Sequence, residues 1–192
     1  MTTFAPTIYT RTFPRAAGWL RDLILIVSGV LFVAALAQVK IPLPFTPVPL
    51  TGQTFAVLLV GATLGSKRGA ASMLLYIALG AFGLPVFAGG ASGFAYLSGA
   101  TLGYLIGFVM AAFVMGLLAE RGLERSIRTS LIPFLVGTII IYICGITWLA
   151  IVLGSFSQAI AAGFLPFLIG DAIKLIAASL ALPAGWKLVG SP

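Results

Sequence analysis

Six long apolar stretches, separated by short polar or charged segments, constrain this chain more than any other feature. They cover residues 23–39, 51–65, 69–82, 99–119, 131–153 and 164–182. Their apolar residues are continuous and do not alternate at every second position, which excludes barrel strands and favours helices. With 60% hydrophobic residues and a mean hydropathy of +1.17, the chain carries more apolar surface than a soluble core can cover. The sequence therefore predicts an all-α integral membrane protein.

The positions of the basic residues test this number of spans independently. If the N-terminus is cytoplasmic, one side of the membrane receives Arg11, Arg15, Arg21, Lys67, Arg68, Arg121, Arg125, Arg128 and Lys187. Lys40 alone falls outside, and Lys174 lies within the last stretch. This is the division that the positive-inside rule expects. We therefore expect a bundle of six transmembrane helices with both termini cytoplasmic.

The chain is expected to form one membrane domain over residues 1–192, with a cytoplasmic segment at 1–20 and the bundle at 21–188. Stretches 51–65 and 69–82 are shorter than the roughly 20 residues of a straight span, so they should extend into their flanks or be shielded by neighbours. The run after Arg21, followed by Ala35-Leu36-Ala37, resembles a signal peptide. The polar lead and the apolar continuation to Val39 favour a retained helix instead.

Composition also excludes several classes of function. The net charge of +7 comes from clusters between the apolar stretches, which indicates membrane topology and not a nucleic-acid partner. The chain lacks His, so His-based triads and imidazole metal sites are excluded, and no cofactor is expected. The lone Cys144 lies in an apolar stretch and is interpreted as packing. The segment 61–67 resembles a phosphate loop but fails its spacing, so any ATP must be used by a partner.

Asp171 and Lys174 in the last stretch are the strongest sign of a binding site. Each charge at membrane depth costs about 2.5–3.5 kcal/mol, so its retention implies a use. Their i,i+3 spacing places both on one helix face, roughly 10 Å from the outer end. They suit a neutral polar group or an anionic ligand. The alternative is an ion pair that only fixes helix packing.

The expected outer loops differ from the inner ones, because 40–50, 84–98 and 154–163 are longer, rich in Gly, Pro and aromatic residues, and nearly uncharged. The run IPLPFTPVP at 41–49 cannot be helical and is interpreted as a wall or lid over a pocket. Hydroxyl, aromatic and amide groups near this end are candidate ligand contacts: Tyr96, Ser98, Thr101, Tyr104 and Gln53. Gly99, Gly103 and Gly107 form a ridge that favours close helix packing.

Four segments in this order resemble the BioY family, the biotin-specific S component of energy-coupling factor (ECF) transporters. They are residues 47–59 (PVPLTGQTFAVLL), 75–88 (LYIALGAFGLPVFA), 103–108 (GYLIGF) and 170–174 (GDAIK). The likeness extends from about Leu36 to Leu182. Residues 99–104 read Gly-Ala-Thr-Leu-Gly-Tyr where the family has Gly-Pro-Thr-Gly-Gly-Tyr, so the pocket width there is expected to differ.

The resemblance implies the six-helix S-component fold and capture of biotin from outside, in the cytoplasmic (inner) membrane and in contact with its lipid. It implies a transmembrane coupling subunit of the EcfT or BioN type and ATP-binding-cassette ATPases of the EcfA or BioM type as partners. Asp171 and Lys174 would be the polar anchors. The loop from Phe87 to Tyr96, with Gly89 and Gly90 as ligand contacts, would form the cavity wall together with the start of the stretch 99–119. Two alternatives stay open: a stand-alone secondary carrier, and an intramembrane enzyme acting on lipid, for which a nucleophile and base are lacking.

Overall fold

The computed structural model describes residues 3–13 and 17–189, so Arg15 lies outside the described residues. Each of the six apolar stretches forms a helix, and the helix bounds differ from the predicted ones by a few residues at most ends. The helices are α2 (Gly18–Gln38), α3 (Gln53–Leu64), α4 (Ser66–Ala81), α6 (Leu102–Glu120), α7 (Ile127–Leu153) and α9 (Leu168–Val189). Because α2 begins before the predicted stretch, it also takes in Asp22.

Several further elements lie in segments that were expected to be irregular. They are α1 (Phe4–Thr12), α5 (Phe94–Leu97), α8 (Phe156–Gly163), the 3₁₀ helix η1 (Leu165–Phe167), and the antiparallel strands β1 (Lys40–Ile41) and β2 (Leu50–Thr51). The prediction of a loop over 154–163 is wrong. Ser155 starts the helix there, since its side chain accepts a hydrogen bond from Gln158 N at 3.3 Å.

The length and apolar surface of the helices identify a multi-pass membrane protein. Within residues 3–13 and 17–189, four segments are long and apolar enough to cross a bilayer: 18–38, 102–120, 128–153 and 156–188. Much of their apolar surface points away from the bundle, with large exposed side chains such as Leu31, Ile143 and Ile173. In lipid this exposure costs nothing, whereas in water it would be unfavourable. Helix α3 is apolar but short, as its sequence predicts.

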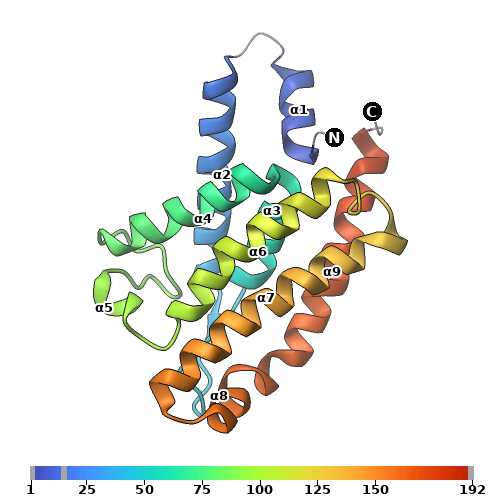
Figure 1. Ribbon diagram of the computed structural model, residues 1–192. Coiled ribbons are helices and arrows are strands. Elements are labelled where there is room, and N and C mark those ends of the chain that lie inside the picture. Colours follow the sequence, from blue (N-terminus) through green and yellow to red (C-terminus); the bar gives the residue numbers. More distant parts are fainter. Residues whose placement is uncertain (1–2, 14–16, 190–192) are drawn as a thin grey trace.

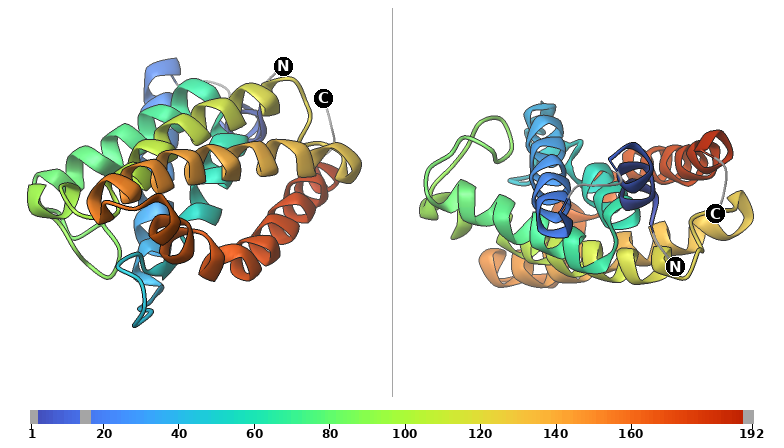
Figure 2. Two further views of the ribbon diagram at one scale, coloured as in Figure 1. Left: turned by 60° about the horizontal axis from the view of Figure 1, so that its bottom comes forward. Right: turned by 90° about the horizontal axis from the view of Figure 1, so that it is seen from above.

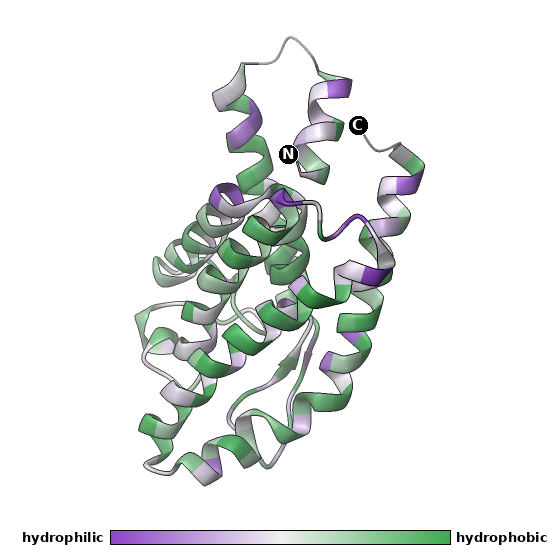
Figure 3. Ribbon diagram, turned by 45° about the vertical axis from the view of Figure 1, so that its right-hand side comes forward, coloured by the Kyte–Doolittle hydropathy of each residue, from purple (hydrophilic) through white to green (hydrophobic). Residues whose placement is uncertain are grey.

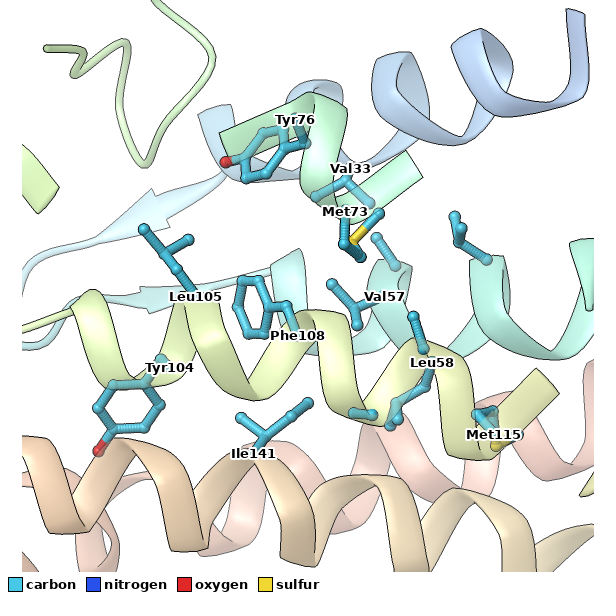
Figure 4. Packing of buried hydrophobic residues seen from close by; sticks show 14 of the residues in the cluster. Val33, Val57, Leu58, Met73, Tyr76, Tyr104, Leu105, Phe108, Met115 and Ile141 are labelled. Atoms are coloured by element: carbon cyan, nitrogen blue, oxygen red, sulfur yellow. The ribbon is translucent and has the colours of Figure 1, made fainter. Parts of the chain in front are cut away.

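Helix α6 lies at the centre of the bundle and packs against α3, α4 and α7 (Figure 1). The predicted glycine ridge is confirmed as a packing surface for Gly103 and Gly107, whereas Gly99 precedes α6 and lies against its own turn. A Cβ atom on Gly103 would lie 2.4 Å from the carbonyl oxygen of Cys144, and one on Gly107 would lie 3.0 Å from Cα of Ile141. Figure 4 shows the core beside this contact, where Phe108 and Val57 lie between the helices. The close approach of α6 and α7 therefore requires glycine.

Most of the charged residues in the described part of the chain gather at one end of the bundle, which we call the charged end. Helix α1 and the end of α9 lie there, beside the connection from α6 to α7 (Figures 1 and 2), and Figure 3 shows the hydrophilic segments at this end. Arg68 Nε lies 2.9 Å from Asp22 Oδ1. Glu120 Oε1 accepts hydrogen bonds from the backbone N–H and the hydroxyl of Ser66, both at 2.8 Å. It thereby gives a partner to a backbone N–H in the first turn of α4 that has no acceptor within the helix. The opposite end carries the loops and the strands.

Candidate functional site

A cavity of about 50 Å³ lies among the helices at the end opposite the charged end. The segment before β2, the first turn of α3, α5, the start of α6, the middle of α7 and the first half of α9 all contribute to its lining. Its walls are largely apolar, with Leu105, Phe108, Ile141 and Phe167 among the lining residues. Asp171 and Lys174 both border it, as the sequence predicts. We call it the Asp171 cavity.

Asp171 and Lys174 form an ion pair at the cavity wall, with 2.9 Å between Lys174 Nζ and Asp171 Oδ1. One turn of α9 separates the two residues, so the helix itself brings both side chains to one face. The side chains are 11% and 23% exposed, respectively. They are therefore largely desolvated, yet neither is closed off from the cavity. A mutually neutralising pair is the arrangement that apolar surroundings require.

The hydrogen bonds of the pair show which of its atoms remain available. Lys174 Nζ donates to Asp171 Oδ1, to the carbonyl oxygen of Thr51 at 2.8 Å and to Thr54 Oγ1 at 3.1 Å. These three bonds use the whole donor capacity of an ammonium group. Asp171 Oδ2 accepts from the hydroxyl of Tyr142 at 2.5 Å, and Oδ1 also accepts from Thr54 at 3.4 Å. A carboxylate has about four lone-pair sites, so Asp171 keeps one for a donor in the cavity.

Four other predicted contacts also line the cavity: Tyr96, Thr101, Tyr104 and Gln53. Tyr104 donates its hydroxyl to the carbonyl oxygen of Gly163 at 2.8 Å, which ties α6 to the end of α8. Gln53 is buried, and its Nε2 donates to the hydroxyl of Tyr76 at 2.8 Å. The second N–H of that amide has no protein acceptor among the bonds formed by described residues, so it is a candidate donor toward the cavity.

Three predicted contacts lie away from the cavity lining. Ser98 donates back into its own turn, to the carbonyl oxygen of Ala95 at 3.1 Å. Gly89 donates its N–H to the carbonyl oxygen of Ala37 at 3.0 Å, and Gly90 lies nearest to the side chain of Gln38. Both glycines have positive φ and pack against the end of α2. The loop that contains them therefore supports the wall from behind.

Sequence reasoning missed three polar residues of the cavity lining. Thr51 accepts a hydrogen bond from Lys174 through its carbonyl oxygen, and the other two are Tyr142 and Thr54. Both contact Asp171, and Tyr142 makes the shortest of its hydrogen bonds. The signal for Tyr142 was a phenol in the middle of an otherwise apolar stretch, where a buried hydroxyl needs a partner. Thr54 directly follows Gln53, which the sequence did single out.

An apolar cavity with a few convergent polar groups, enclosed by membrane helices, is the arrangement of a solute-binding membrane protein. Comparison with known families identifies the family within this class. The model of the BioY family matches residues 7–191, and the chain belongs to that family.

Individual relatives align with this chain over most of their length, which supports this assignment. The chain is 38% identical over 181 residues to the Biotin transporter BioY of Rhizobium etli, covering 88% of this chain and 96% of that protein. It is 41% identical over 156 residues to the Biotin transporter BioY of Thermotoga maritima, covering 81% and 91%. The crystal structure of an S-component for biotin from an ECF-type ABC transporter superposes with a TM-score of 0.79 at 27% identity, covering 90% of this chain and 93% of that one.

Proposed function

We propose that this chain is the biotin-binding, substrate-capture subunit of an ECF-type importer and that biotin binds in the Asp171 cavity. The observation that carries the proposal is the Asp171–Lys174–Tyr142 cluster at the wall of an otherwise apolar cavity. The cluster belongs to a chain whose relatives are named biotin transporters. Biotin uptake is accordingly the function of this chain.

The chemistry of biotin fits the groups that the cavity leaves available. Its ureido group presents two N–H donors and one carbonyl, and the free lone pair of Asp171 accepts one of those N–H groups. The remaining amide proton of Gln53 donates to the ureido carbonyl. Lys174 holds the Asp171 carboxylate in place through the ion pair between them. The apolar side chains of the cavity cover the fused rings and the alkyl tail of the ligand.

In this proposal the six helices cross the cytoplasmic membrane with both termini inside, and the cavity opens toward the exterior. The gathering of basic residues at the charged end supports that orientation. The shorter helices α3 and α4 pack against α6 and are shielded by it. Lipid covers the exposed apolar faces of the longer helices.

The chain is proposed to act without catalysing a reaction, as a transport subunit. Its sequence contains no phosphate loop, so energy must come from ATP-binding-cassette ATPases of the EcfA or BioM type, through a transmembrane coupling subunit of the EcfT or BioN type. Uptake of biotin should therefore stop in cells that lack these subunits. Undiminished uptake in such cells would instead establish a stand-alone carrier.

Calorimetric titration of the purified protein tests ligand identity. Biotin should bind saturably, and desthiobiotin, which keeps the ureido group but lacks the sulfur-containing ring, should bind more weakly because it buries less apolar surface. Riboflavin, a vitamin with a different ring system, serves as the control and should give no saturable heat. Equal binding of riboflavin, or no binding of biotin, would contradict the proposal.

A further inference from the structure

A second cavity, of about 370 Å³, borders the Asp171 cavity. It is formed between the proline-rich segment that follows β1 and the turn that joins α5 to α6. Pro49, Tyr96 and Thr101 line both cavities and are their common wall. The two cavities are therefore adjacent, and only these three of the described residues line both. We call this second space the Lys40 cavity, after the one charged residue in its lining.

The backbone fixes Lys40 close to the Asp171 cluster. In the two-stranded ladder Lys40 pairs with Thr51, and such paired residues have Cα atoms roughly 5 Å apart. The carbonyl oxygen of that same Thr51 accepts the hydrogen bond from Lys174. One short ladder thus positions two lysines, one at the wall of each cavity.

Gly89 provides the space for the stem of Lys40. A Cβ atom on Gly89 would lie 2.7 Å from Cδ of Lys40, and the φ of Gly89 is +68°. No other residue type fits that contact and that backbone conformation without strain. The glycine loop that the sequence predicted as a ligand contact therefore positions the side chain of Lys40.

The two lysines differ in whether their charge is compensated. All three protons of Lys174 are bonded to protein acceptors, one of them the Asp171 carboxylate. Among residues 3–13 and 17–189, none forms a hydrogen bond or an ion pair with the Lys40 ammonium group. Of the two, Lys40 is consequently the cation that a ligand anion can reach without displacing a protein partner.

We propose that Lys40 binds the carboxylate of the ligand and selects for an acid at that end. This inference rests on the proposed function, because it extends the same ligand from one cavity into the next. The ureido head then lies at Asp171, the alkyl tail passes between Pro49, Tyr96 and Thr101, and the carboxylate meets the ammonium group. A charge-assisted hydrogen bond of this kind favours the anion over a neutral amide of the same shape.

Binding of biotin and of biotinamide, which carries a neutral amide in place of the carboxylate, tests the inference. Lys40→Met keeps the apolar stem against Gly89 and removes only the charge. It should weaken biotin about tenfold and leave the affinity for biotinamide within about twofold. Lys40→Arg should keep most of the biotin affinity. Lys67→Met, at an exposed lysine of the charged end, is the matched control and should change neither affinity.

Each outcome of this comparison has a definite meaning. Unchanged biotin affinity in Lys40→Met, or equal losses for both ligands, would overturn the role of Lys40 while leaving biotin binding intact. If the wild-type protein bound neither ligand, the proposed function and this inference would both fail. Raised salt should weaken biotin more in the wild type than in Lys40→Met, because the ammonium group is exposed and its attraction is screened.

Discussion

The two ends of helix α9 contribute to two buried polar clusters that differ in what surrounds them. Near its start, Asp171 and Lys174 border a cavity. Near its end, Trp186 Nε1 donates to Glu124 Oε1 at 3.0 Å, and the Glu124 side chain is 0% exposed. Both clusters are costly in an apolar bundle. In the proposed function, a buried charged cluster binds a ligand only where the packing leaves an adjacent cavity.

The cluster at the charged end is enclosed on several sides. The guanidinium of Arg125 lies over the ring of Trp186 at 4.5 Å, and the ring of Phe4 meets the same tryptophan edge-on at 5.3 Å. A Cβ atom on Gly185 would lie 3.1 Å from Phe4. Helix α1, the α6–α7 connection and the end of α9 are therefore joined at one point. We infer that this cluster stabilises the bundle, whereas the Asp171 cluster binds the ligand.

Asp171→Asn should have the largest effect on biotin affinity and best distinguishes the roles of the two clusters. It removes the anionic acceptor and leaves the Lys174 charge uncompensated, so biotin affinity should fall at least about 100-fold, or about 3 kcal/mol. Asp22→Asn is the matched control, because it also removes a carboxylate paired with a basic side chain, at the charged end. Calorimetry should show unchanged biotin affinity in that control. Equal losses in the two variants would contradict the assignment of the site.

Trp186→Phe should affect stability and not binding. The change removes the donor to a buried carboxylate, which costs about 1–3 kcal/mol of unfolding free energy. Thermal unfolding in detergent should show a lower Tm, while the Kd for biotin stays within about twofold. A large loss of biotin affinity in a protein that still folds would show that the two ends of α9 are coupled. It would contradict the separate roles of the two clusters.

Tyr142→Phe should have a smaller effect on binding than Asp171→Asn. The phenol donates to Asp171 Oδ2 and so orients the carboxylate, and its loss should weaken biotin about tenfold. Tyr104→Phe is a useful control, because the hydroxyl of that cavity residue is bonded to a backbone carbonyl and not to Asp171. Titration of both variants should show the greater loss in Tyr142→Phe. The reverse order would indicate that Asp171 needs no orienting donor.

The sequence predicts the six helices and the main polar pair because both depend on local patterns. Apolar continuity determines where helices form, and the i,i+3 spacing alone places Asp171 and Lys174 on one face. The predicted packing role of Gly103 is likewise confirmed, since small residues on one helix ridge allow close approach of a neighbour.

The features that the sequence did not predict depend on contacts between segments that are far apart in the sequence. Tyr142 reaches Asp171 only because α7 packs against α9, which no local pattern encodes. Glu124 lies between Arg121 and Arg125, which were expected on the cytoplasmic side, and its complete burial follows from the positions of α1 and α9. Gly89 resembled a ligand contact because the loop motif is glycine-rich, but the glycine is required by the backbone and by the stem of Lys40.

The smallest expected effect concerns the response of the Glu124 cluster to pH. Burial raises the pKa of the Glu124 carboxyl above its ordinary value, although Arg125 and the bond from Trp186 act in the opposite direction. The folded state therefore holds this proton more tightly than the unfolded state does. As pH rises from the unfolded pKa through the raised folded pKa, the contribution of this group to stability falls.

Glu124→Gln removes this titration and should flatten the pH dependence of Tm. Between about pH 4.5 and neutrality, the Tm of the wild type should fall further than that of the variant. The difference should be about 2–4 °C for each kcal/mol that Glu124 contributes to the free energy of unfolding. The Kd for biotin should be the same in both proteins at each pH, because Asp171 lies at the other end of α9. Parallel Tm curves would show that Glu124 titrates alike in the folded and unfolded states, and the enclosure of its cluster would then have no energetic consequence for the carboxyl.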